Sequence, residues 1–499
     1  MTRLGFVLDQ RSCIGCHACT VACKVEHGVE LGVFRTWVKY IETGTFPDAR
    51  RSFSVMRCNQ CTDAPCVEVC PVTALYKRED GIVDFDPDRC IGCKACLNAC
   101  PYDALYIDPD SHTAAKCNFC AHRVDHGLKP SCEIVCPTQA IISGDLDDPS
   151  SQVSLLIETV PARVRAPEQN TAPNVFYLGA HEASIDPLAI AQGQEYLTEI
   201  TEAQREKLAP LAEEGGARAV ADVEHPPAWG WRVSSYFLSK GVAAGAMMLA
   251  LLLGAGGALS DVVPGLLALG GIALTGAFLI SDLGRPDRFH YLFTRPQWRS
   301  WLAIGSQVIN GAALVALAYT GAALLGLDGL RDALQWVLVP AGAALAGYSA
   351  FLFNQCEGRD LWQSPLLLPH TITNALMAGA GALGIAALVV DAPGSALRSL
   401  GWALGLSAAL SLAIAVVDAW RPHPTRQAER AAKNLRRDRY ARRFYAGLGF
   451  GFLLPALLAA LFLAIGGVAV LALAGASALA GLWLYEDAWV RAGQSVPLS

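Results

Sequence analysis

RSCIGCHACTVAC, residues 11–23, places four cysteines at the spacing C-x2-C-x2-C-x3-C. Sixteen of the chain's 17 cysteines lie between Cys13 and Cys136, and they fall into four groups of four. These groups are Cys13, Cys16, Cys19 and Cys23; Cys58, Cys61, Cys66 and Cys70; Cys90, Cys93, Cys96 and Cys100; and Cys117, Cys120, Cys132 and Cys136. The first and third groups share CIGC-x-AC-x3-C, and the second and fourth begin with CN-x-C. This alternation indicates a duplicated unit with one copy inserted into the other.

The density of cysteines is compatible with disulfides, zinc sites or iron–sulfur clusters. No secretory signal and no twin arginine precede the first group, so we expect the cysteines to be reduced. A tetrahedral zinc ion rarely takes three ligands from one seven-residue turn. The x2-x2-x3 run instead binds [4Fe–4S] clusters in bacterial ferredoxins. The sequence therefore predicts four [4Fe–4S] clusters.

Residues 1–146 contain no glycine-rich phosphate loop and no Ser/His/Asp set beside the cysteines. Four clusters in so small a domain favour electron transfer over catalysis on a substrate. We expect an α+β, ferredoxin-like double module here, and a linker over residues 147–230. Within that linker, residues 165–178 are expected to be extended, and the acidic stretch 194–216 is expected to form a surface helix.

Charge and hydropathy change sharply along the chain. Residues 1–230 hold 20 basic and 32 acidic residues, a net charge of −12, whereas residues 231–499 have a net charge of +6. Eight apolar stretches follow residue 230, each long enough to cross a hydrocarbon core of about 30 Å. They cover residues 234–254, 262–281, 301–325, 334–353, 366–390, 400–417, 446–465 and 468–485. The sequence thus predicts an all-α membrane domain of eight helices over residues 231–499.

Eight crossings place both ends of the membrane domain on one side of the membrane. The loops and tail on that side carry 15 Lys and Arg residues, and the opposite loops carry only Arg331 and Arg398. The positive-inside rule therefore predicts a multi-pass protein of the cytoplasmic (inner) membrane with its iron–sulfur domain facing the cytoplasm. Membrane lipid is an expected partner, and nucleic acid is not.

Polar residues inside a membrane are costly and often functional. Several fall in the predicted cytoplasmic halves of the helices: Lys240, Asp282, Gln307, Asn310, Asn354, His370 and Asn374. Together they favour a polar pocket for a quinone headgroup, with His370 as a proton donor or acceptor. The alternative is interhelical hydrogen bonding together with a Lys240–Asp282 ion pair. Only His370 among the histidines lies within a predicted span, so we expect no haem.

Residues 1–146 resemble the four-cluster electron-transfer subunit of the DMSO reductase and polysulfide reductase families of molybdoenzymes. Residues 231–499 resemble the haem-free, NrfD-type anchor of polysulfide reductase, through SDLGRPDRFHYLFTRP and GYSAFLFNQCEGRDLWQSPLLLPH. By resemblance to two-cluster ferredoxins, the fourth cysteine of each run ligates another cluster. The implied ligand sets are Cys13, Cys16, Cys19 and Cys136; Cys117, Cys120, Cys132 and Cys23; Cys58, Cys61, Cys66 and Cys100; and Cys90, Cys93, Cys96 and Cys70.

The resemblance implies an oxidoreductase subunit that performs a quinone half-reaction. Electrons would pass between menaquinone or ubiquinone, as an exchangeable substrate, and a separate catalytic subunit with a molybdenum or tungsten pterin. The subunits are separate chains in many relatives, whereas this chain joins them. Two other hypotheses remain open at this point: a redox-driven module that translocates ions or protons, in which Lys240 and Asp282 matter most, and a passive anchor.

Overall fold

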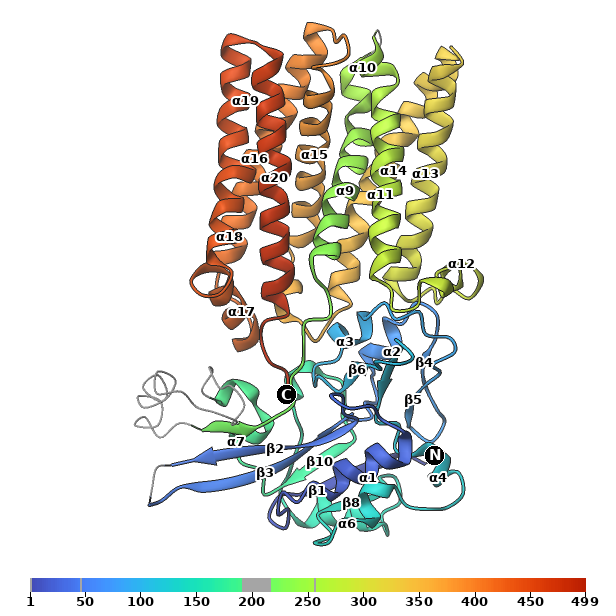
Figure 1. Ribbon diagram of the computed structural model, residues 1–499, viewed down its shortest axis with the longest axis vertical. Helices are drawn as coiled ribbons and strands as arrows, with labels where there is room; N and C mark the ends of the chain where they lie inside the picture. Colours follow the sequence, from blue (N-terminus) through green and yellow to red (C-terminus); the bar gives the residue numbers. More distant parts are fainter. Residues whose placement is uncertain (1, 45–46, 191–216, 255–256) are drawn as a thin grey trace. The chain divides into compact units, whose positions relative to one another are not determined.

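The computed structural model describes residues 2–44, 47–190, 217–254 and 257–499 (Figure 1). The chain divides into two compact units. The first comprises Met1–Pro226 with Cys356–Gly358 and Pro497–Ser499, and the second comprises Pro227–Gln355 with Arg359–Val496. The acidic stretch 194–216, predicted to be a surface helix, lies outside the described residues.

A four-stranded sheet organises the first unit, and its strands follow the order β8-β1-β10-β9. The central strand β1 (Leu4–Asp9) runs antiparallel to β8 (Ile141–Asp145) and parallel to β10 (Val175–Leu178). The fourth strand, β9 (Ala162–Arg163), pairs with β10. The strand before the first cysteine group, β1, therefore pairs with the strand after the last group, β8. The two ends of the cysteine-containing segment lie side by side.

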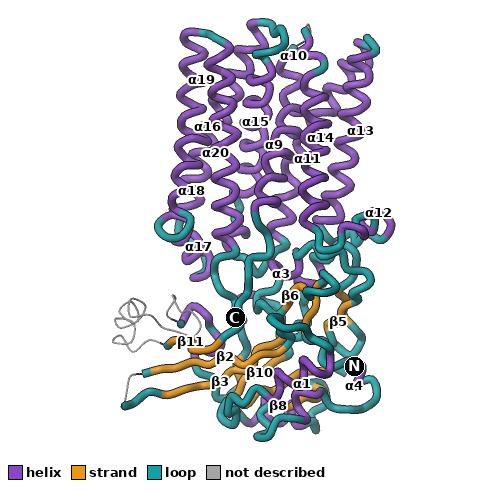
Figure 2. Tube along the Cα trace, viewed as in Figure 1, coloured by secondary structure: helices purple, strands orange, loops and turns teal. Residues whose placement is uncertain are grey.

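Short elements fill the rest of the first unit, where strands and helices mix as an α+β fold requires (Figure 2). A second sheet has the order β11-β2-β3, and two hairpins pair β4 with β5 and β6 with β7. The strands of these sheets are β2 (Thr36–Thr43), β3 (Arg50–Arg57), β4 (Leu75–Lys77), β5 (Val83–Phe85), β6 (Leu105–Ile107), β7 (Ala114–Lys116) and β11 (Arg218–Ala221). The helices are α1 (Ala18–His27), α2 (Pro65–Glu68), α3 (Ala95–Ala99), α4 (Ala121–Val124), α5 (Ser131–Ile134), α6 (Gln152–Thr159) and α7 (Glu182–Ile185), with short 3₁₀ turns at Pro167–Gln169 and Pro187–Ala189.

The described part of the predicted linker takes part in these sheets. The stretch predicted to be extended contains the turn at Pro167–Gln169 and the strand β10, which pairs with β1 along the whole of its length. The strand β11 pairs with β2. The first compact unit accordingly runs on to Pro226.

A polar cluster centred on Glu26 ties α1 to α4 and α5. The carboxylate of Glu26 accepts hydrogen bonds from Ser131 Oγ at 2.5 Å and from Arg123 Nη1 at 3.2 Å, and it lies 2.7 Å from His122 Nε2. These hydrogen bonds, from Ser131 first and then from His122, lower the pKa of Glu26 to about 2. The ionised carboxylate therefore stabilises the contact between the first and fourth cysteine groups.

We expect Glu26→Gln to destabilise the first unit by about 1–2 kcal/mol at neutral pH. Folding lowers the pKa of Glu26 from an unfolded value of about 4.3. The stabilisation by Glu26 is therefore complete above that pH and is lost as the pH falls toward 2. Thermal unfolding followed by circular dichroism should show a difference from wild type that shrinks below pH 4.5. Glu30→Gln, at an exposed position, is the matched control. A difference that stayed constant down to pH 3 would contradict the assignment.

The second unit is a helical bundle (Figure 1). Seven of its described helical segments are long and apolar enough to cross a membrane: Trp231–Leu253, Val263–Asp282, Trp301–Leu324, Asp328–Asn354, Gly394–Trp420, Ala441–Ile465 and Val468–Gly493. Five of these segments are single helices: α11 (Val263–Asp282), α13 (Trp301–Leu324), α14 (Asp328–Asn354), α16 (Gly394–Trp420) and α20 (Val468–Gly493). The first segment is α9 (Trp231–Leu249) followed by a 3₁₀ turn. The sixth consists of α18 (Ala441–Ala446), a π-helix and α19 (Leu454–Ile465). Shorter helices are α10 (Ala258–Asp261), α12 (Tyr291–Thr294) and α17 (Arg426–Arg436), with 3₁₀ turns at Pro286–Arg288 and Asp360–Trp362.

The fifth predicted crossing forms the helix α15 (Leu367–Ala386), which packs against α9, α16 and α20. It is not one of the seven segments that qualify on length and hydropathy. The reason lies in its first two turns, which carry Pro369, His370 and Asn374 among apolar residues. Seven crossings are thus supported by composition, and the eighth remains a prediction.

Glycines bring α15 into backbone contact with its neighbours. A Cβ placed on Gly245 of α9 would lie 1.8 Å from the carbonyl oxygen of Ala375, and one on Gly379 would lie 2.2 Å from the carbonyl carbon of Gly245. A Cβ on Gly475 of α20 would lie 2.3 Å from the oxygen of Gly381. Small residues allow such close approach in membranes, where van der Waals packing drives helix association. The helix that fails the length and hydropathy criterion is therefore packed closely against both α9 and α20.

We expect Gly245→Val to force α9 and α15 apart, because the added side chain would overlap the backbone of Ala375. The variant should lose a large part of its thermal stability in detergent, by about 1–3 kcal/mol or more. Gly270→Val, on α11 with open space around its Cβ, is the control. Equal melting temperatures for the two variants would show that the contact is unimportant.

Candidate functional site

The first and third cysteine groups form loops of the same shape. In each, the glycine of CIGC and the residue after its second cysteine have positive φ: Gly15 (70°) and His17 (59°), then Gly92 (68°) and Lys94 (63°). Glycine is needed at position 15, because a Cβ there would lie 2.4 Å from the ring of Phe53. The repeated sequence thus folds into a repeated loop, after which the short helices α1 and α3 begin.

Cysteines of the first and fourth groups lie together in the first unit. Burial raises the pKa of Cys23, and the neighbouring thiols of Cys117 and Cys132 raise it further. Burial also raises the pKa of Cys13, with a contribution from Cys136. The last cysteine of each of these groups therefore neighbours cysteines of the other group.

The second and third groups show the same reciprocal arrangement. Burial raises the pKa of Cys66, and the nearby thiols of Cys100 and Cys58 add to this effect. For Cys93, burial again dominates the rise in pKa, and the thiol of Cys70 contributes. The structure thus brings together members of two groups around each of these sites.

The last cysteines of three groups precede a proline, at Pro71, Pro101 and Pro137. After Cys70 and after Cys136 the chain turns back, so that an amide four residues later reaches the sulfur. Ala74 N donates to Cys70 Sγ, and Ala140 N donates to Cys136 Sγ, both at 3.2 Å. Such N–H donors stabilise a thiolate, which is the form that binds a metal.

The first group departs from this pattern. Lys24 follows Cys23, and α1 continues through both residues to His27. Cys23 therefore projects from the middle of a helix, whereas Cys100 follows the last residue of α3. The difference follows directly from the missing proline, which would have ended the helix.

The donor atoms around these sites fit iron–sulfur clusters. The sites offer cysteine thiols, the usual ligands of [4Fe–4S] clusters. Backbone amides donate to the sulfurs of Cys70 and Cys136. Within the described residues, no three His, Cys, Asp or Glu side chains converge as a site for a single metal ion. A bound [4Fe–4S] cluster would supply one-electron transfer, and the cysteines would hold it.

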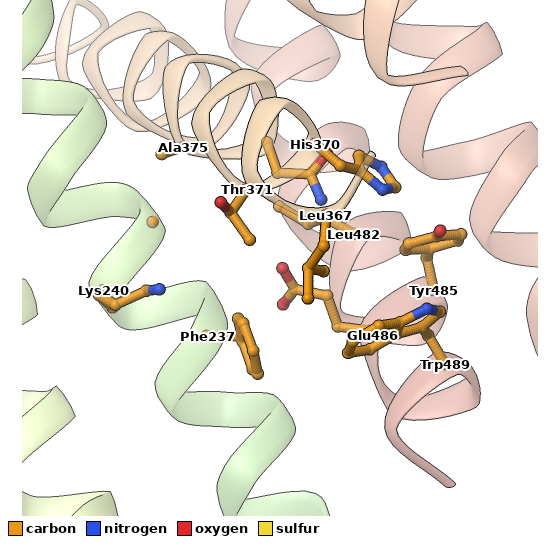
Figure 3. A pocket seen from close by; sticks show the side chains of 12 residues that line it. Phe237, Lys240, Leu367, His370, Thr371, Ala375, Leu482, Tyr485, Glu486 and Trp489 are labelled. Atoms are coloured by element: carbon orange, nitrogen blue, oxygen red, sulfur yellow. The ribbon is translucent and has the colours of Figure 1, made fainter. Parts of the chain in front are cut away.

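A second candidate site lies within the helical bundle, between α9, α15 and α20 (Figure 3). A cavity of about 30 Å³, room for an ordered water, is enclosed there. Its polar lining consists of Lys240, His370, Thr371, Asn374, Tyr485 and Glu486, and its apolar lining includes Phe237, Leu367, Leu482 and Trp489. Lys240, His370, Asn374 and Glu486 are each at most 7% exposed.

Three polar atoms in this pocket are buried and have no hydrogen-bond partner among the residues that the structure describes: His370 Nε2, Asn374 Oδ1 and Glu486 Oε2. The His370 ring packs edge-on against Tyr485 at 5.2 Å. Because buried polar groups nearly always have partners, an unsatisfied set around one cavity calls for a molecule with donors and acceptors. These three atoms therefore make the pocket a candidate binding site.

Lys240 is held by α14 (Asp328–Asn354). Its ammonium donates to the carbonyl of Ala346 at 3.0 Å and to the hydroxyl of Ser349, and it lies over the rings of Phe237 and Tyr348. These hydrogen bonds of Lys240 go to α14, and its ion pair with Asp282 stays a prediction. The acidic group that faces Lys240 across the pocket is Glu486 (Figure 3).

Only three of the seven predicted pocket residues line the cavity: Lys240, His370 and Asn374. Asp282 and Asn354 are the last residues of α11 (Val263–Asp282) and α14. On α13 (Trp301–Leu324), the amide of Asn310 donates to Ser306 O at 2.8 Å, and that of Gln307 donates to Leu292 O at 3.4 Å. None of these four residues is among those that line the cavity, so this structure gives the predicted pocket no support at their positions.

Glu486 and Tyr485 were not among the predicted pocket residues. The predicted last span ends at residue 485, whereas α20 (Val468–Gly493) continues for two more turns. The apolar residues Trp489 and Val490 beyond the acidic pair could have shown that the helix goes on. Asp487, by contrast, is satisfied: it accepts from Arg491 Nε at 2.8 Å and pairs with Arg443.

Comparison with known proteins agrees with the division of the chain into an iron–sulfur unit and a helical membrane unit. Residues 220–496, more than half of the chain, match the family described as polysulphide reductase, NrfD. The chain belongs to the NrfD family. Residues 50–146 match a 4Fe–4S dicluster domain, so this NrfD-family protein carries its iron–sulfur module in the same chain.

Relatives of the front part are separate subunits of reductases. The B component of tetrathionate reductase from Salmonella typhimurium is 42% identical over 190 residues, which cover 37% of this chain and 76% of the relative. The B component of polysulfide reductase from Wolinella succinogenes is 38% identical over 187 residues, 37% of this chain and 98% of the relative. The arsenate respiratory reductase iron–sulfur subunit of a Shewanella species is 37% identical, over 35% of this chain and 96% of its own. The NrfD-family chain is thus an iron–sulfur electron-transfer component of an oxidoreductase complex, joined to a multi-pass membrane domain.

Proposed function

We propose that this protein passes electrons between a membrane quinone and a separate catalytic subunit with a molybdenum or tungsten pterin, through four [4Fe–4S] clusters. The relatives named above are iron–sulfur subunits of reductases, which supports a catalytic partner. The membrane pocket with three unpartnered polar atoms is the observation that carries the quinone assignment.

The four clusters would take the crossed ligand sets, in which Cys136, Cys23, Cys100 and Cys70 each complete the site of another group. The neighbouring thiols of Cys23, Cys117 and Cys132 support this assignment, as do those of Cys66, Cys100 and Cys58. Each cluster would pass one electron at a time, and the protein would supply its ligands and their hydrogen bonds.

The pocket has the groups that quinone chemistry needs. Oxidation of a quinol releases two electrons and two protons, and reduction of a quinone takes up the same number. His370 Nε2 can bond to a headgroup oxygen, and the oxygens of Asn374 and Glu486 can accept from quinol hydroxyls. The 30 Å³ cavity admits a headgroup oxygen, with the ring against apolar residues such as Phe237 and Trp489.

The test uses the purified full chain in lipid nanodiscs, with its clusters reduced by a short-chain quinol or by dithionite. We expect His370→Ala and Asn374→Ala to slow reduction by quinol at least tenfold and to leave reduction by dithionite unchanged. Asn310→Ala, outside the pocket, is the matched control. Unchanged quinol-driven reduction in both pocket variants would exclude this site, and absence of a pterin-containing large subunit from the purified complex would exclude the proposed partner.

A redox-driven proton-translocating module is the second candidate, favoured by two titratable side chains, Lys240 and Glu486, that face each other across a water-sized cavity. In that case, quinol-driven reduction in sealed vesicles would change rate when a protonophore collapses the proton gradient. For a simple quinone site, the rate would be the same with and without the protonophore.

We also propose eight crossings, with the iron–sulfur unit in the cytoplasm of a bacterial cell. An epitope inserted at the Gly466-Gly467 turn, between α19 and α20, tests this topology. It should be reached by antibody in intact spheroplasts, because this turn lies on the side opposite the basic loops. Labelling only after the membrane is broken would reverse the assignment.

A further inference from the structure

Two basic side chains are completely buried in the iron–sulfur unit, at equivalent positions of the internal repeat. Arg57 directly precedes CNQC of the second cysteine group, and Lys116 directly precedes CNFC of the fourth. Both are 0% exposed. Burying a cation is expensive unless an anion compensates for it.

Among the described residues, Arg57 has sulfur, and no carboxylate, as its charged partner. Its Nη1 donates to Cys132 Sγ at 3.3 Å, and its guanidinium lies 4.3 Å from the centre of the Phe6 ring. Its Nε and Nη2 atoms are buried without any hydrogen-bond partner. Cys19 of the first group belongs to the same buried cluster as Phe6 and Cys132. Two nitrogens of the Arg57 guanidinium are therefore left to face an anion that the side chains alone do not provide.

Lys116 is held by main-chain oxygens. Its ammonium donates to Cys117 O at 3.0 Å and to Val83 O. The same Cys117 oxygen accepts a hydrogen bond from Gln60 Nε2 at 3.0 Å, and Gln60 directly precedes Cys61, so the ammonium of Lys116 lies beside the second group. Its charge lowers the pKa of Cys61 and Cys66 against the larger rise caused by burial. Within the part of the chain that the structure describes, neither Lys116 nor Arg57 forms an ion pair with an acidic side chain.

Each of the two cations thus lies beside cysteines of a group other than the one it directly precedes, just as each proposed ligand set combines cysteines of two groups. The cation before the second group neighbours thiols of the first and fourth groups, and the cation before the fourth group neighbours thiols of the second group. A cluster with its four thiolates carries net negative charge, which grows by one when the cluster takes up an electron. In a low-dielectric interior, a fixed positive charge stabilises the reduced form more than the oxidised form.

We propose that Arg57 and Lys116 are positioning residues that raise the reduction potentials of the clusters beside them. Arg57 acts on the clusters proposed for Cys19 and Cys132, and Lys116 acts on the cluster proposed for Cys61 and Cys66. The inference rests on the proposed four-cluster function. In this proposal the two residues set the reduction potentials of clusters and do not bind a substrate.

Redox titration of the purified full chain, followed by electron paramagnetic resonance, tests the proposal. Arg57→Met should shift the reduction equilibrium of one or both neighbouring clusters at least tenfold toward the oxidised form, 59 mV for one electron. Arg57→Lys, which keeps a positive charge, should shift it less. Arg50→Met, at the exposed end of the same strand β3, should leave all potentials unchanged.

Lys116→Met provides an independent arm, because it should shift a different cluster from the one affected by Arg57→Met. Unchanged potentials in both methionine variants, or equal shifts in Arg57→Lys and Arg57→Met, would overturn the proposal. If Arg57→Met does not assemble, Arg57→Gln and the Lys116 variants decide the outcome. Iron and sulfide analysis of the wild-type protein tests the four-cluster function separately, so that its failure is distinguishable from that of the electrostatic role.

Discussion

Cys23→Ala is expected to remove one cluster and about a quarter of the iron, and the cluster lost should be the one bound by the fourth group. Cys23 lies on α1, next to the cysteines of its own run, yet the thiols with the largest effect on its pKa are Cys117 and Cys132. Alanine is a good helix former, so α1 should persist. The effect should therefore be limited to the cluster.

Two comparisons make this prediction decisive. Cys120→Ala should give the same remaining electron paramagnetic resonance spectrum as Cys23→Ala, because both remove a ligand from one cluster. Cys16→Ala, in the same run as Cys23, should remove a different signal. If the spectra of the Cys23 and Cys16 variants coincide, each run binds its own cluster and the crossed assignment is wrong.

Glu486→Gln is expected to slow quinol-driven reduction of the clusters by about 100-fold, the lower end of the effect of removing a general base. Its carboxylate is 7% exposed, and its Oε2 atom has no partner in the structure. Glutamine has the same shape but cannot accept a proton from a quinol. Reduction by dithionite, which does not need the pocket, should be unaffected.

Lys240→Met should reduce the same rate, because the ammonium of Lys240 faces the carboxylate of Glu486 across the pocket (Figure 3). In the double variant the two effects should not add, since the pair acts as one unit. Stopped-flow spectroscopy of the cluster absorbance measures all three rates. Full quinol-driven activity in Glu486→Gln would show that the proton leaves by another route, and strictly additive effects would show that the two charges act independently.

The cysteine half could be predicted from the sequence to a considerable depth, because ligand spacing is a local property. The repeated CIGC loops fold alike at Gly15 and Gly92, and α1 continues past Lys24, where the other three groups have a proline. The burial of Arg57 and Lys116 could not be predicted in this way. A basic residue before a cysteine is normally exposed, and only the packed fold shows that these two are enclosed.

The membrane half was predictable in its helices and much less so in its pocket. Hydropathy marks where a helix crosses a membrane but not which of its faces meets another helix. Lys240, His370 and Asn374 face the cavity, whereas Asn310 bonds to its own helix. Glu486 was missed because an acidic pair in an apolar run resembles the end of a span.

The last residues of the chain have a consequence for the order in which the protein is made. Leu498 and Ser499 are buried in the first unit, where Arg165 Nη2 donates to Leu498 O at 2.6 Å and Lys39 Nζ donates to Ser499 O at 2.7 Å. Lys39 and Arg165 leave the ribosome long before these acceptors, which follow every helix of the bundle in the sequence. The iron–sulfur unit therefore cannot complete its packing during its own synthesis. A chain interrupted in the membrane domain would lack these acceptors for Lys39 and Arg165, so completion of the electron-transfer unit depends on residues that are made after the helical bundle.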